Sequence, residues 1–163
     1  MNRFSLDRES LDRLDMFVKH VENILNRLDS IKEQLNRNNL LYKLVEALTL
    51  HKSYVLNLKK FLSGEIDWNP PTHTQCNFGK IYYSIDPNYI NNTYGEGVTS
   101  AFKRIGIIHM KFHEIAEEYL NVQNLYEFKM LIVELASKST LLVETMFELL
   151  ETISVNHNIN DLR

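Results

Sequence analysis

All five glycines and all three prolines of this 163-residue chain fall between positions 64 and 106. These two residue types are the strongest local breakers of helices and strands. The segments on either side are therefore free to form long, uninterrupted elements. In both, apolar residues recur at alternating spacings of three and four, which is the period of a helix with one buried face. The distribution predicts an all-α fold with one irregular segment in its middle.

Four stretches carry such an apolar stripe. The first begins at Leu11 and returns to the stripe at Leu35, and the sequence NRNN at 36–39 is expected to end it as a turn. The second spans about 40–62, with Gly64 as its C-cap. The third runs from about 98 to 120 or 121, and the fourth from about 123 to 155. Each stripe needs partners across a broad face, so the helices are expected to form a bundle.

The irregular segment is expected to contain one short helix, from about residue 76 to 84. The stretch DPNYINNTYGEG at 86–97 is rich in turn residues and is expected to be a loop. We therefore predict a four-helix bundle with a structured loop and a short helix between the second and third long helices. The chain is expected to be a single domain over 1–163, with an N-terminal helix at 1–37 that could dimerise, a core at 38–121 and a C-terminal helix at 122–156.

Charge and cysteine content narrow the function classes. A net charge of −3 argues against nucleic-acid binding, which usually needs a basic surface. The sequence contains no run of 18 apolar residues, so no membrane span is predicted, and the charged N-terminus does not resemble a secretory signal. A single cysteine cannot form an intrachain disulfide, so we expect a cytoplasmic protein whose thiol is free or bound to metal.

Four residues carry the clearest chemistry. His109 and His113 lie four apart on one helix face. His51 lies on the apolar stripe of another helix, where its neighbours on the stripe are leucine and valine. Cys76 stands near the start of the short helix. Imidazole and thiolate are the preferred zinc ligands, so the four together predict a tetrahedral site. Taken singly, each has a simpler interpretation: His51 as a hydrogen-bonded core residue, Cys76 as a small buried apolar residue.

Three segments strengthen the metal interpretation: HKSYVLNLKKFLSG, HTQCNFGKIYYS and IHMKFHEIAEEYL. In this order they resemble the bacterial chemoreceptor zinc-binding (CZB) domain family. The resemblance implies that zinc is held by the following residues: His51, Cys76, His109 and His113. It also implies that Tyr54, Phe78 and Gly79 pack around the site, and that Cys76 is the redox-reactive group.

The resemblance implies a cytoplasmic sensor or regulatory domain for bacterial signalling. Members respond to zinc, and some respond to oxidants such as hypochlorous acid. Three histidines and one cysteine close a zinc tetrahedron, so no enzyme activity is expected. Expected partners are a chemoreceptor or diguanylate cyclase signalling module, or a separate signalling protein, and the first helix suggests a homodimer. The chain is expected to be either a sensor from a larger protein or a stand-alone version.

Two alternatives remain open. A hemerythrin-like diiron oxygen-binding protein is also a four-helix bundle with histidines on its helices, although it would need more histidines and bridging carboxylates, and Cys76 argues against it. A metal-free helical interaction module would leave the histidine pair without a role. Among the other histidines, His20 is expected to be solvated and His157 to lie in a frayed tail. His73 is not among the expected ligands, although its H-x2-C spacing to Cys76 is one that could bind a metal.

Overall fold

The computed structural model describes residues 8–32 and 39–156. Within these ranges the chain forms six α-helices and one 3-10 helix, and no strand. The four long helices are α1 (Arg8–Lys32), α2 (Leu40–Leu62), α5 (Glu96–Glu117) and α6 (Leu125–Asn156). Between α2 and α5 come α3 (Asn77–Tyr82) and α4 (Pro87–Tyr94), and the 3-10 helix η1 (Glu118–Asn121) extends α5. The predicted all-α bundle is confirmed.

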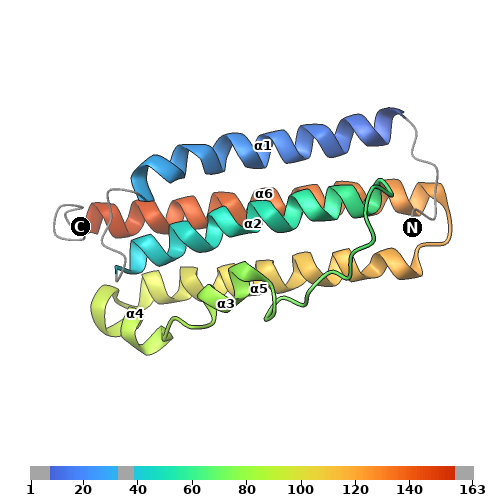
Figure 1. Cartoon of the computed structure of the whole chain (residues 1–163). Coiled ribbons are helices and arrows are strands. Elements are labelled where there is room, and N and C mark those ends of the chain that lie inside the picture. Colours follow the sequence, from blue (N-terminus) through green and yellow to red (C-terminus); the bar gives the residue numbers. More distant parts are fainter. Residues whose placement is uncertain (1–7, 33–38, 157–163) are drawn as a thin grey trace.

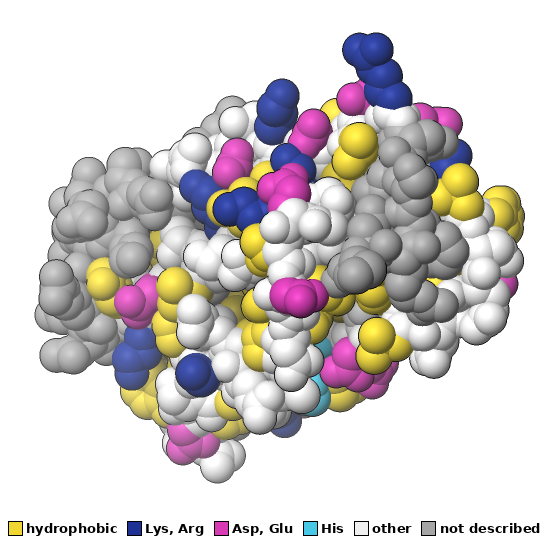
Figure 2. All heavy atoms as spheres, turned by 45° about the vertical axis from the view of Figure 1, so that its right-hand side comes forward, with side chains coloured by type: hydrophobic (Ala, Val, Ile, Leu, Met, Phe, Trp, Pro, Cys, Tyr) yellow, Lys and Arg dark blue, Asp and Glu magenta, His cyan; other side chains and the backbone are white. Residues whose placement is uncertain are grey.

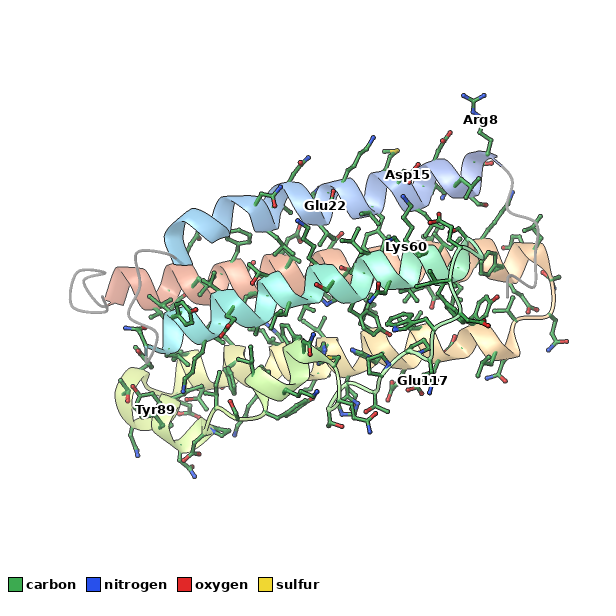
Figure 3. All side chains as sticks on the ribbon, in the orientation of Figure 1. Arg8, Asp15, Glu22, Lys60, Tyr89 and Glu117 are labelled. Carbon is green, nitrogen blue, oxygen red and sulfur yellow. The ribbon has the colours of Figure 1, made fainter. Side chains whose placement is uncertain are left out.

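The long helices lie side by side, with α1 next to α2 and α5 next to α6 (Figure 1). The chain leaves the end of α2 as an extended segment, runs back along α5, and enters α3 on the flank of the bundle (Figure 1). Side chains fill the interior between α2, α3 and α5 (Figure 3). The irregular middle of the sequence is thus folded onto the outside of α2 and α5.

The second helix begins and ends where the sequence predicts. The side chain of Asn39 accepts a hydrogen bond from the Leu41 backbone N–H at 2.7 Å, which satisfies one of the free donors of the first turn. At the other end, Gly64 has a φ of 79° and lets the chain leave the helix at low steric cost. The turn predicted at 36–39 lies outside the described residues apart from Asn39.

The prediction of a loop over 86–97 is wrong, because residues 87–94 form α4. The Asp86 side chain accepts from the Asn88 N–H at 2.9 Å, and Pro87 occupies the first helical turn, where its missing N–H costs nothing. Gly95, with a φ of 92°, separates α4 from α5. The residues that indicated a turn are helix caps here, and α5 consequently begins at Glu96.

The predicted stripes form the core. Leu14, Val18, Val21 and Leu25 of α1 are buried, whereas Leu11 at the predicted start of that stripe remains 38% exposed. On the other long helices the buried stripe residues include Leu44, Leu48, Val55, Leu58, Phe102, Ile105, Phe112, Phe128, Ile132, Leu142 and Met146. An ion pair between Lys59 and Asp15 joins α2 to α1 at the surface. Among the helices of the described ranges, none is long and apolar enough to cross a bilayer.

Candidate metal centre

His109 and His113 occupy successive turns of α5 on the face turned toward the bundle interior. Their ring centroids are 4.7 Å apart, and the side chains are 0% and 2% exposed. The apolar residues around them on the same helix, Ile105 and Phe112, are fully buried and hold this face inward. Two imidazoles are thereby fixed next to each other in a place that water does not reach.

Cys76 reaches this histidine pair from a different segment of the chain. Its Sγ lies 3.2 Å from His109 Nε2, although 33 residues separate the two in sequence. Cys76 caps α3, and its sulfur accepts the Gly79 backbone N–H at 3.2 Å. One donor atom from each of Cys76, His109 and His113 falls within 4.8 Å of the others. The three are therefore close enough together to share one ion.

The hydrogen bonds of the histidines show which ring nitrogens are free to bind a metal ion. His113 Nδ1 lies 3.0 Å from the Pro71 carbonyl oxygen, which can only accept, so Nδ1 carries the proton. Nε2 of His113 is then left with a free lone pair, and it is buried without a hydrogen-bond partner. His109 Nδ1 is likewise buried and unpartnered. A metal-bound histidine commonly donates its second N–H to a backbone carbonyl in this way, so these residues fit a metal ion.

Burial keeps the histidines uncharged. Desolvation, followed by the neighbouring His113, lowers the pKa of His109 from 6.5 to about 2. The same two causes lower the pKa of His51 to about 3. Desolvation lowers the pKa of His113 to about 4, against the opposing effect of the Pro71 carbonyl. All three are therefore neutral at pH 7, the form in which imidazole binds metals.

The thiol of Cys76, unlike the neutral histidines, must lose a proton before it can bind a metal. Burial raises the pKa of Cys76, and the N–H of Gly79 only partly offsets that rise. The protein groups around the sulfur therefore favour the thiol over the thiolate. A bound cation would reverse this preference, because coordination removes the proton from a thiol outright.

His51 lies beside this group but is not a member of it. The side chain is 1% exposed and stands edge-on to Phe112, with ring centroids 5.1 Å apart. Its Nε2 is 3.0 Å from the Oγ of Ser139 on α6. Of the four predicted ligands, the structure brings three within 4.8 Å of one another and holds the fourth against a different partner.

Ser139 lies on the apolar stripe of the last long helix, and the sequence analysis did not identify it as a site residue. Ser139 is 0% exposed and lies on the face of α6 that also carries the buried Leu135, Leu142 and Met146. The sequence held one signal: a hydroxyl on an otherwise apolar stripe needs a buried partner. Nothing in the spacing identified His51, 88 residues away, as that partner.

The three residues predicted to surround the site do contact its donors. The Tyr54 ring lies 4.5 Å from that of His113, and the Phe78 ring lies 4.3 Å from that of His109. Gly79 supplies the N–H to the Cys76 sulfur. These contacts enclose the donors, and on the face shown in Figure 2 only a small area of histidine surface is visible.

The remaining histidines differ in their distance from the site. His73 is half-buried, and its ring centroid lies 6.4 Å from that of His109 and 6.5 Å from that of His113. His73 is thus a neighbour of the three donors without belonging to their group. His20 is exposed on α1, as predicted, and His157 lies outside the described residues.

Comparison with known proteins agrees with this geometry. Residues 51–120 match the family described as the chemoreceptor zinc-binding domain, CZB. The matched range begins at His51 and includes Cys76, His109 and His113. Searches of curated proteins and of solved structures returned no significant match. Residues 51–120 of this chain are thus similar to the chemoreceptor zinc-binding domain family.

Proposed function

We propose that the chain is a zinc-binding sensor domain of a bacterial signalling system, without enzymatic activity. Cys76, His109 and His113 would hold the ion, and His51 would complete the tetrahedron. The observation that carries the proposal is the buried, unpartnered Nε2 of His113, a residue whose donor atom lies within 4.8 Å of those of His109 and Cys76. A buried polar atom without a partner is costly, and a metal ion would satisfy it.

The residues of the site would do three things. The Pro71 carbonyl fixes the proton of His113 on Nδ1 and so orients Nε2. Gly79 holds the Cys76 sulfur next to His109. Tyr54 and Phe78 exclude water from the donors. Bound zinc would stabilise the thiolate of Cys76 and join the segment before α3 to α5.

Oxidant sensing is part of the same proposal. The thiolate sulfur of Cys76 would give two electrons to hypochlorous acid, so that chloride leaves and one oxygen stays on sulfur as a sulfenic acid. The sulfenic acid is a poorer metal ligand, and the segment 63–76 would then separate from α5. Replacing Cys76 by alanine should abolish any oxidant-dependent change in helix packing, while the helix content measured by circular dichroism stays close to that of the original chain.

The output would pass through another protein, or through a signalling module joined to this one. A chemoreceptor or a diguanylate cyclase module is the expected recipient, and a homodimer is the expected assembly. The buried stripe of α1 is already used in packing within the chain, against α2. A dimer would therefore need other surface residues, and sedimentation at several protein concentrations tests whether it forms.

The deciding experiment is metal content by elemental analysis on protein purified without added zinc. We expect about one zinc per chain, with a clear reduction in Cys76→Ala and in His113→Ala. His20→Ala is the matched control, because it removes an exposed imidazole and should leave the content unchanged. Iron in place of zinc would favour the diiron alternative, and a folded chain without metal would favour the helical interaction module.

A further inference from the structure

Ser139 and His51 form a buried pair that links the metal centre to the last helix. His51 Nε2 and Ser139 Oγ are 3.0 Å apart, and the two side chains are 1% and 0% exposed. The contact joins α2 to α6, whereas the three clustered donors come from α5 and the residue that caps α3. The pair is thus a polar connection to a helix that supplies no donor to the cluster.

One nitrogen cannot serve this hydroxyl and a metal ion together. If Ser139 donates its hydrogen, the hydrogen bond occupies the Nε2 lone pair of His51. If Ser139 accepts, Nε2 carries the proton and has no lone pair to offer. In either arrangement, coordination through Nε2 requires the hydrogen bond to break.

The position of the His51 ring shows which of these two partners Nε2 contacts in the structure. His51 lies outside the group in which the donor atoms of Cys76, His109 and His113 are within 4.8 Å of one another. For Nε2 to join them, the His51 side chain must move. Such a movement carries Nε2 away from an oxygen that is now 3.0 Å distant.

We propose that Ser139 competes with the metal for Nε2 of His51, so that recruitment of His51 as fourth ligand through this atom releases the polar link between α2 and α6. This inference rests on the proposed function, because it takes zinc as the ion and His51 as its fourth ligand. Ser139 acts as a positioning residue that holds His51 back from the cluster. The state of the metal centre would thereby be transmitted to α6 through the loss or gain of one buried hydrogen bond.

The test is zinc affinity, measured by competition with a chromophoric chelator, for the original chain and for Ser139→Ala. Removing the competitor should tighten zinc binding by about 2- to 10-fold, the equivalent of one net hydrogen bond. Thr145→Ala is the matched control: it removes another buried hydroxyl from α6 and should leave the affinity unchanged. Unchanged or weaker binding by Ser139→Ala overturns the inference, since weaker binding would mean that Ser139 orients His51 toward the metal.

A second measurement does not depend on whether Ser139→Ala folds. In the original chain labelled with 15N-histidine, zinc addition should move the His51 Nε2 resonance from its hydrogen-bonded to its coordinated position, with His51→Gln used for assignment. Coordination through Nδ1, or no change at His51 while zinc binds, overturns the inference and leaves the zinc site standing. If the original chain binds no zinc at all, the proposed function itself fails.

Discussion

Gly79 packs directly against the backbone of His73. A Cβ added to Gly79 would stand 1.8 Å from the His73 carbonyl oxygen, which leaves no room for any side chain. The same carbonyl lies 3.5 Å from the Cys76 sulfur, and the Gly79 N–H lies 3.2 Å from that sulfur. The position of the thiol therefore depends on how closely two stretches of backbone approach each other.

Replacing Gly79 by alanine should displace the backbone at residues 73 and 74 and move the Cys76 sulfur. We expect a loss of about 1–3 kcal/mol of stability, as for other overpacked sites, together with weaker metal binding. Gly97→Ala is the control, because its Cβ would meet nothing within 4 Å. Chemical denaturation and zinc titration measure the two effects, and equal behaviour of the two variants would contradict the proposed role of Gly79.

Acid should destabilise the chain in the presence of a chelator. The folded pKa values of His109, His51 and His113 are lowered to about 2, 3 and 4, whereas the unfolded groups titrate near 6.5. Below pH 6.5 the unfolded state binds more protons, so stability is complete above that pH and falls as the pH drops toward 4. Each histidine adds a slope of about 1.4 kcal/mol per pH unit in this window.

Urea denaturation between pH 7.5 and 4.5 measures that slope. His51→Leu should reduce it, because this substitution removes one of the three buried imidazoles. A stability that stays flat from pH 7 to pH 5 would show that the three imidazoles are not buried in neutral form.

Cobalt provides a direct probe of the thiolate. With Co2+ in place of zinc, the original chain should show an intense near-ultraviolet charge-transfer band from sulfur to metal, and Cys76→Ser should lose it. The weaker visible bands of tetrahedral Co2+ should be reduced rather than absent, because His109 and His113 remain. A charge-transfer band that survives the substitution would contradict coordination by Cys76, since the chain has no other thiol.

Two tyrosines offer a matched comparison of buried hydroxyls. The Tyr54 hydroxyl is buried without a hydrogen-bond partner, whereas Tyr82 donates to the Phe102 carbonyl at 2.6 Å. Tyr54→Phe should therefore leave stability unchanged or raise it, and Tyr82→Phe should lower it by about 1 kcal/mol. Thermal unfolding of the two variants decides this, and a larger loss from Tyr54→Phe would mean that its hydroxyl has a partner.

Much of the fold was predictable because helix formation is governed by short-range patterns. The stripes of α2 and α5 follow a period of 3.6 residues, and Asn39 and Gly64 are caps that act within one turn of their helix. The adjacency of His109 and His113 follows from the same period. The short helix α4 was missed because proline and aspartate favour both turns and helix starts, and only the packing of residues such as Ile90 distinguishes the two.

The site was less predictable than the helices that carry it. Residue types and family resemblance pointed to four ligands, but the direction of a side chain depends on contacts made by distant segments. His51 faces Ser139 because α6 packs against α2, and the sequence around His51 contains no trace of that contact. The Pro71 carbonyl that sets the His113 proton is equally invisible, because any residue at that position would present the same group.

The proximity of Cys76 to His109 has a consequence for the unfolded chain. With a single cysteine, this protein cannot use a disulfide to tie its irregular middle segment to a helix. A metal ion shared by side chains 33 residues apart would act as a covalent-like crosslink, closing a loop whose entropy the unfolded state would otherwise keep. A disulfide is opened by a reductant, whereas this crosslink would be opened by a chelator or by an oxidant, so the same contact would both join the two segments and allow them to separate.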